Sequence, residues 1–339
     1  MEKITVEGEV LDASGQLVTD FTGIVNPTVK DSKVTVTCLK NSNKDDSPAF
    51  TFTDYPNTIF IGNDSVRNGK FSFTFTVPKD ISYSNLQGKM NLYAVDTESG
   101  NEAQGNFDNF IVGGTSDTAE TDTIGPEIRA LYLNDTTFVD GGQVNTTPYF
   151  VAELWDKSGV NITGSSVGHD MMLVIDESTV LSYNLNSYYE LLPGEDGTGI
   201  VKFPIPALEP GKHTAEFWVW DILNNSTVRT FTFEVVEGLK PFLFDVIATP
   251  GIAREQVTFH LMHNRPESRM RVGIMVYDLA GRQLWKHEES GTSGLFENYT
   301  VSWDLTSGGA RMRPGVYIYR AAISTDNSKD ATKARKFII

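Results

Sequence analysis

The chain has one residue that could act as a thiol nucleophile, Cys38. It continues the alternation of Val34 and Val36, so the pattern of the strand predicts that all three side chains share one apolar face. A thiol buried among apolar side chains keeps its proton and reacts slowly. The nearest histidine in the sequence is His169, far along the chain. We therefore predict a structural Cys38, no catalytic residue, no disulfide framework and no cysteine-based metal cluster.

The five histidines form no pair that could share a metal ion. His260 and His263 are three residues apart in a strand-like run, and residues three apart in a strand point to opposite faces. His169 is followed by Asp170, and a carboxylate beside an imidazole can orient it. A structural hydrogen bond made from a loop is the simpler interpretation of His169. The sequence also has no G-x-S-x-G elbow, P-loop or G-x-G-x-x-G fingerprint.

Acidic turns offer oxygen ligands of the kind that calcium prefers. Candidates are Asp156, Asp221 with the nearby Asn224 and Asn225, and Glu195-Asp196-Gly197. None of them follows EF-hand spacing. Asp and Asn are also the ordinary residues of turns, because their side chains bond to nearby backbone groups. No cofactor or metal site is predicted, and a structural calcium ion is kept as the alternative.

Trp218 and Trp220 share one face of the expected strand 214–220. Two aromatic rings in line could stack on a sugar, which would suit a carbohydrate-binding module. Large aromatic side chains also contribute most of the buried area of a small sandwich. We predict that the tryptophan face packs in the core and that Ala215, Phe217 and Val219 lie on the other side.

Short strands must position all of these residues. Apolar and polar residues alternate along the chain, which buries one face of a strand and leaves the other in water. Examples are 34–38 (VTVTC), 71–77 (FSFTFTV), 231–235 (FTFEV), 272–276 (VGIMV) and 317–319 (YIY). Short, frequent strands separated by Gly, Asn, Asp and Pro are typical of β-sandwiches, so the predicted fold class is all-β.

Two boundaries divide the chain. Residues 113–125 (GGTSDTAETDTIG) are polar, acidic and free of aromatic residues, as linkers are. A second boundary lies near 236–241, where one alternating strand ends and another begins. The layout of the middle block resembles bacterial immunoglobulin-like repeats. We predict three consecutive immunoglobulin-like β-sandwich domains, at 1–113, 124–237 and 238–339.

The composition narrows the functions. The 339 residues include 28 Lys+Arg and 44 Asp+Glu, a formal net charge of −16. Phosphate contacts need clustered cations, so a nucleic-acid partner is excluded. No apolar run approaches the ~18–20 residues of a transmembrane segment, and the first residues do not have the pattern of a signal peptide. The chain is expected to be cytosolic or, as we argue next, a piece of a larger protein.

Residues 238–339 contain four characteristic stretches, namely 275–282 (MVYDLAGR), 302–304 (SWD), 314–320 (PGVYIYR) and the basic, apolar end 333–339 (KARKFII). With these stretches, the segment resembles the C-terminal sorting domain of the bacterial type IX secretion system. The usual Tyr-Pro-Asn-Pro-like opening is replaced by 248–253 (ATPGIA). In that family the domain is a small sandwich recognised at the outer membrane. The resemblance therefore implies a type IX outer-membrane translocon or shuttle protein as partner.

Upstream motifs are similar to the region after the protease domain of the type IX sortase, a gingipain-like cysteine peptidase. They are 21–23 (FTG), 66–71 (VRNGKF), 77–83 (VPKDISY), 122–128 (DTIGPEI) and 168–170 (GHD). In that family the sortase removes sorting domains from cargo and joins the new C-terminus to a surface lipopolysaccharide. Its catalytic His and Cys lie in a caspase-like α/β domain. No part of this chain resembles that domain, and Cys38 does not match the nucleophile.

The resemblance implies a non-catalytic C-terminal fragment of a gingipain-like peptidase or sortase, secreted or held at the cell surface. Its expected roles are export, surface docking and support of its own N-terminal peptidase domain. The alternative is a surface carbohydrate-binding or adhesion protein. Lys333, Arg335 and Lys336 place positive charge on the expected last strand, next to Phe337. Such charges protect an edge strand from aggregation, or they mark an edge on which a receptor docks by strand pairing.

Overall fold

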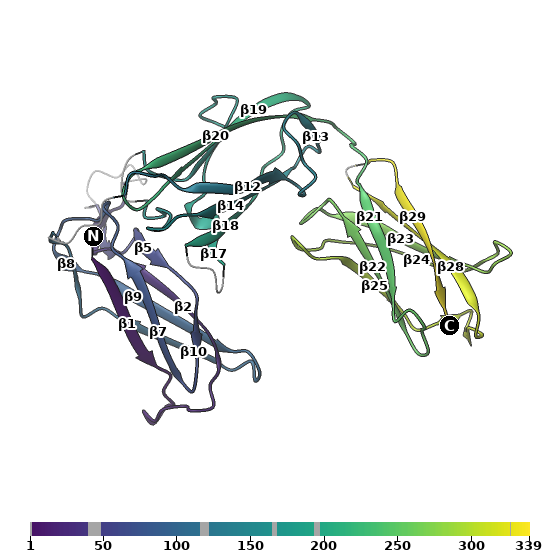
Figure 1. The fold of residues 1–339 in the computed structure, drawn as a ribbon, viewed down its shortest axis with the longest axis horizontal. Coiled ribbons are helices and arrows are strands. Elements are labelled where there is room, and N and C mark those ends of the chain that lie inside the picture. The colour runs from purple at the N-terminus through teal and green to yellow at the C-terminus, as the bar shows by residue number, and fades with distance from the viewer. Residues whose placement is uncertain (1, 40–48, 116–121, 165–167, 193–196, 326) are drawn as a thin grey trace. The chain divides into compact units, whose positions relative to one another are not determined.

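The protein is built almost entirely of β-strands (Figure 1). The computed structural model describes residues 2–39, 49–115, 122–164, 168–192, 197–325 and 327–339. Strands β1 to β29 and one short 3₁₀ turn, η1 (Asn186–Tyr188), make up the elements of this part of the chain. Within it, no helix has the length and apolar character needed to cross a membrane. The predicted all-β class is confirmed.

The chain divides into two compact units. Unit 1 holds Met1–Leu131, Ala152–Lys202 and Thr214–Thr230, and unit 2 holds Tyr132–Val151, Phe203–His213 and Phe231–Ile339. The residues of the middle segment are thus shared between the units. The domain boundaries at 113, 124 and 238 stay a prediction.

The first segment of unit 1 has two sheets that share one apolar core. The smaller sheet pairs β1 with β7, and the larger has the order β10-β9-β2-β5, with β6 also pairing with β2. Val25 and Val29 from the larger sheet and Phe73 from the smaller one are buried in the core. The strands are β1 (Lys3–Glu9), β2 (Gly23–Lys30), β5 (Thr58–Ile61), β6 (Asp64–Val66), β7 (Lys70–Thr76), β9 (Lys89–Asp96) and β10 (Glu102–Phe107).

Local sequence explains two features of this segment. Asn68 and Gly69 have φ values of 53° and 73°, the left-handed conformations that a tight turn needs, and they connect β6 to β7. Pro27 lies inside β2, where its missing N–H costs a ladder hydrogen bond. On the side of β2 away from β9, the partner changes from β6 at residues 23–25 to β5 at residues 28–30, so Pro27 falls between the two ladders.

Short strand pairs complete this segment. They are β3 (Val34–Thr37) with β4 (Thr51–Asp54), and β8 (Leu86–Gln87) with β11 (Ile111–Val112).

The middle segment contributes strands to both units. In unit 1, β15 pairs with β16 and β19, and β17 pairs with β18. In unit 2, residues 142–144 of β13 run parallel to residues 233–235 of β20. The strands are β12 (Glu127–Leu133), β13 (Gly142–Val144), β14 (Tyr149–Trp155), β15 (Met172–Ile175), β16 (Ser182–Asn184), β17 (Tyr189–Leu191), β18 (Thr198–Pro204), β19 (Gly211–Trp220) and β20 (Ser226–Val235).

The last segment, in unit 2, forms a sandwich of its own sheets (Figure 1). One sheet has the order β21-β22-β25 and the other β24-β23-β28-β29, with β26 and β27 as a separate pair. Phe259, Trp303 and Phe337 are buried in the shared core. The strands are β21 (Leu243–Thr249), β22 (Val257–His263), β23 (Met270–Tyr277), β24 (Gln283–Gly291), β25 (Tyr299–Trp303), β26 (Thr306–Ser307), β27 (Ala310–Arg311), β28 (Val316–Ser324) and β29 (Ala331–Ile338).

Candidate functional site

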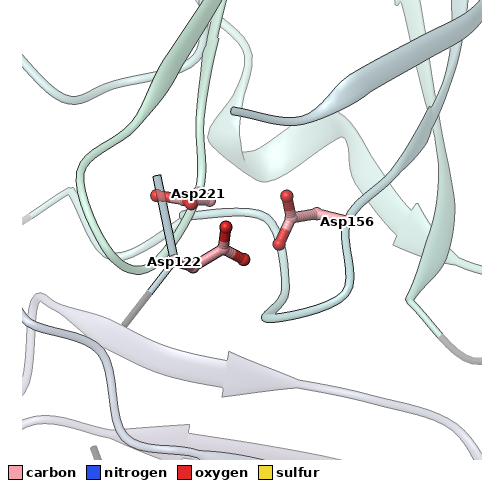
Figure 2. Close-up of side chains that lie close together, drawn as sticks. All are labelled: Asp122, Asp156 and Asp221. Atoms are coloured by element: carbon pink, nitrogen blue, oxygen red, sulfur yellow. The ribbon is translucent and has the colours of Figure 1, made fainter. Parts of the chain in front are cut away.

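Three carboxylates from separate parts of unit 1 lie together (Figure 2). Asp122 precedes β12, Asp156 follows β14 and Asp221 follows β19. One oxygen atom from each lies within 4.8 Å of the others. Asp156 and Asp221 are buried, and Asp122 is half-buried. We call these three residues the acidic cluster.

Two members of the acidic cluster also close turns, as predicted. Asp156 Oδ1 accepts backbone N–H groups of Ser158 at 2.8 Å and Gly159 at 2.9 Å. Asp221 Oδ1 likewise accepts the N–H groups of Leu223 and Asn225, at 2.9 and 2.7 Å. The other candidate pair, Glu195 and Asp196, lies outside the described residues.

Asp122 joins the linker to both turns. Its Oδ2 accepts the Ser158 hydroxyl at 2.8 Å, and its carbonyl oxygen accepts Asn225 Nδ2 at 3.0 Å. Nothing in the sequence grouped Asp122 with Asp156 and Asp221. Its partners come from distant loops, and a linker aspartate carries no local signal of such contacts.

The surroundings shift the pKa values of the three carboxyl groups in different directions. Burial raises the pKa of Asp156 to about 6, and the charges of Asp221 and Asp122 act in the same direction. Burial also raises the pKa of Asp221. The pKa of Asp122 is lowered, first by the hydrogen bond from the Ile124 N–H and then by Ser158. The acidic cluster therefore favours a proton on its buried members.

The acidic cluster has the donor type of a calcium site but supplies a partial coordination sphere. Calcium takes about six to eight oxygen ligands, and three carboxylates provide the charge but few of those contacts. The buried hydroxyl of Tyr189 has no hydrogen-bond partner in the described part of the chain. Burial raises its pKa, and so does the charge of Asp156. The geometry thus defines an acidic cluster that can hold protons or attract a cation.

A second polar cluster surrounds Asp80, between β7 and β8. Its Oδ2 lies 2.6 Å from His169 Nδ1, and its Oδ1 accepts Asn224 Nδ2 at 2.9 Å. The His169 ring packs against Trp220, with 4.4 Å between the ring centroids. A structural hydrogen bond for His169 is confirmed, but the partner is Asp80. The neighbouring Asp170 instead accepts Asn186 Nδ2, at 2.7 Å.

Cys38 is exposed, so the prediction of a buried thiol is wrong. Cys38 lies one residue beyond β3, whose described partner is β4. Val34 and Val36 in that strand are half-buried. Alternation told us which residues share a face, but not whether a second layer covers it. Here the small β3–β4 pair leaves the end of the strand open.

The prediction for the tryptophan strand is also wrong. Ala215, Phe217 and Val219 are buried, whereas Trp218 and Trp220 are half-buried on the other face of β19. Pairing explains the choice of face, because Phe217 lies opposite Leu173 of β15 and both are fully buried. The rings on the outer face make local contacts instead.

His260 and His263 have different hydrogen-bond partners, as expected for two faces of a strand. His260 Nε2 lies 2.7 Å from Thr249 Oγ1, and His263 Nε2 lies 2.8 Å from Ser293 Oγ. Arg265 donates its backbone N–H to His263 Nδ1. The proton of neutral His263 is therefore on Nε2, where it faces Ser293 and cannot serve as a base for that hydroxyl. Burial lowers the pKa of His263 to about 4.

The basic last strand lies at the edge of its sheet, as predicted. β29 follows β28 in the sheet order. Arg335 forms an ion pair with Asp245 at 2.8 Å, and Lys333 donates to the carbonyl oxygen of Phe244. Lys336 is exposed, while Phe337 is buried. Two of the three cations thus bind strand β21 of the same sandwich.

The chain was compared with protein families, curated proteins and solved structures. A scan against protein-family models found no match, and no curated protein matched. One similar solved structure is Escherichia coli alpha-2-macroglobulin spanning domains MG0-NIE-MG1. The alignment includes 63% of this chain and 71% of that chain, at 10% identity and a TM-score of 0.32. Dimeric latent PorU from Porphyromonas gingivalis covers 99% of this chain at 38% identity and a TM-score of 0.41. This chain is similar in sequence to PorU and spans 31% of the PorU chain.

Proposed function

We propose that this chain is the non-catalytic C-terminal region of a gingipain-like peptidase or sortase, and that it serves export through a type IX secretion system and docking at the cell surface. The observation that carries the proposal is the 38% identity to PorU over 99% of this chain. The similarity therefore covers all three predicted blocks and is not confined to the motifs of the sorting-like end.

The surroundings of the candidate nucleophile support a non-catalytic role. Cys38 is exposed next to the small β3–β4 pair, and His169 is bonded to Asp80 and packed on Trp220. A cysteine peptidase needs a thiol and a base within hydrogen-bond reach. The peptidase domain of the parent protein supplies both in this proposal, and the present chain supports and delivers it.

The proposed docking element is the terminal strand β29. It is an edge strand with an exposed Lys336, and such an edge can pair with a strand of a receptor. The partner is a type IX outer-membrane translocon or shuttle protein, and the location is the cell surface. Trp218 and Trp220 give little support to the carbohydrate-binding alternative, because both are half-buried and Trp220 packs on His169.

The test is delivery of the native protein in its own host. Removing Phe337 to Ile339 should leave unit 1 folded and prevent detection at the cell surface by antibody on intact cells. Limited proteolysis of the retained protein checks that unit 1 is intact. Normal delivery of the truncated protein would show that this terminus is not the export signal.

A further inference from the structure

The outer face of the β2, β9 and β10 sheet carries two rows of uncharged polar side chains. The strand register places Asn26 opposite Tyr93 and Tyr93 opposite Gln104. One step along the strands, Thr28 lies opposite Asn91 and Asn91 opposite Asn106. Residues directly opposite each other in a sheet share a face, about 5 Å apart. We call these six residues the amide face.

The amide face is open to solvent and hollowed. Asn91, Tyr93, Gln104 and Asn106 are exposed, and a hollow of about 540 Å³ is lined by all six residues together with Leu92 and Gly105. The buried residues of β2 and β9, such as Val25, Val29 and Ala94, point to the opposite side and form the core. The amide face is therefore not needed to close the sandwich.

Hydrogen-bonding groups on this face are available to a ligand. Asn26 donates to Asn63, while no side-chain hydrogen bond holds Thr28, Asn91, Gln104 or Asn106 within the described residues. Each amide offers two donors and an acceptor oxygen. Tyr93, 40% exposed, supplies a ring between the polar groups. Glu102, in the neighbouring row, forms a hydrogen bond with Tyr93 that holds the hydroxyl.

We propose that the amide face binds a neutral glycan. Hydroxyl groups of a sugar both donate and accept, which matches amides, and the apolar side of a sugar ring can lie on Tyr93. The six residues carry no formal charge, so they offer an anionic polymer no ion pair. The neighbouring rows of the same face hold Glu102 on one side and Lys30 opposite Lys89 on the other. An open hollow on a sheet face, lined by amides around one aromatic ring, suits an extended, polyhydroxylated chain. This inference is independent of the proposed export function.

The experiment uses the purified chain and an array of immobilised neutral, sulfated and uronate-containing oligosaccharides, followed by calorimetric titration of linear gluco-, manno- and galacto-hexasaccharides. We expect binding to neutral glycans alone. Tyr93→Ala should weaken the affinity by about tenfold or more. Asn91→Ala should weaken it by about three- to tenfold, the loss of one or two hydrogen bonds.

Two control variants isolate the amide face. Tyr83→Ala removes another exposed tyrosine of the same segment, and Trp218→Ala removes the ring that the sequence singled out for sugar stacking. Both should bind like the unmodified chain, and circular dichroism should show all four variants folded. The proposal would be overturned if the chain bound no neutral glycan, or if Tyr93→Ala bound glycans as tightly as the unmodified chain. Loss of glycan binding in Trp218→Ala would also overturn it. Self-association that Tyr93→Ala abolishes, without glycan binding, would overturn it as well and indicate a protein partner.

Discussion

Among single residues, Asp156 is one whose protonation should affect the stability of the folded chain. Its pKa is raised from 3.8 to about 6. At pH values between these two, the folded chain keeps a proton that the unfolded chain has released. The contribution of Asp156 to stability must then fall as pH rises from about 4 to 6, by on the order of 2–3 kcal/mol for a shift of this size. The raised pKa of Asp221 acts in the same direction. Buried His263, whose pKa is lowered to about 4, contributes with the opposite sign over the same range.

The variant Asp156→Asn tests this linkage, because the amide keeps the acceptor oxygen for Ser158 and Gly159. Urea unfolding at pH 5 and pH 7, in buffer with EDTA, should show that the stability of the variant relative to the unmodified chain increases between the two pH values. At pH 7 the variant should equal or exceed the unmodified chain in stability. Parallel pH profiles for the two proteins would contradict the assigned electrostatics.

The exposed Cys38 gives a second expectation for a single residue. The folded chain should react with a thiol reagent at close to the rate of a free model cysteine, and Cys38→Ser should leave the free energy of unfolding within about 0.5 kcal/mol. Absorbance of the released chromophore measures the rate. Protection of the thiol until denaturant is added would contradict the exposed position.

Cys38 and the tryptophans show the limit of prediction at this scale. Alternation correctly grouped Ala215 with Phe217 and Val219, and Trp218 with Trp220. It could not decide which group faces a second layer, since that depends on which strands cover the sheet. The acidic cluster could not be predicted from the sequence for a similar reason. Its members come from three loops that only the folded chain brings together.

The turn around Asp80 should hold parts of unit 1 together. Asp80→Ala removes the acceptor for His169 and Asn224 and should destabilise unit 1 by about 1–3 kcal/mol, because half-buried donors lose their partner. Asp80→Asn keeps one acceptor oxygen and should cost less. Thermal unfolding followed by circular dichroism ranks the variants. Equal stability of all three proteins would show that the cluster around Asp80 is not a structural contact.

The terminal strand combines a structural residue with an exposed one. Phe337 is 3% exposed and packs on Phe259 and Trp303, so Phe337→Ala should destabilise its sandwich by about 3–5 kcal/mol. Lys336→Glu, on the exposed side, should leave stability within about 0.5 kcal/mol. Chemical denaturation measures both. A large loss of stability in Lys336→Glu would mean that the exposed cation has a structural role.

Strands and turns were the most predictable elements. Alternation located β7, β20, β23 and β28, because half-buried strands need a period of two. The turn at Asn68-Gly69 has an equally local cause, because both residues adopt left-handed φ values that Asn and Gly accept readily. Sheet partners were not predictable, since pairing joins strands distant in sequence, as β1 with β7 and β22 with β25 show.

Across the whole molecule, the all-β class followed from the sequence, whereas the two boundaries between the three predicted domains stay a prediction. The two compact units share the middle segment, and the linker-like composition of 113–125 carries no information on such packing. The prediction of function depended on sequence motifs and not on a recognised functional site.

We propose that this chain directs export to the cell surface by a type IX system. The most direct measurement joins a periplasmic reporter to the N-terminus of the whole chain, in a host with an intact type IX translocon and in the same host without it. Surface labelling of intact cells should find the reporter outside in the first host and retained in the second. Retention in both hosts, or equal surface labelling in both, would contradict the account.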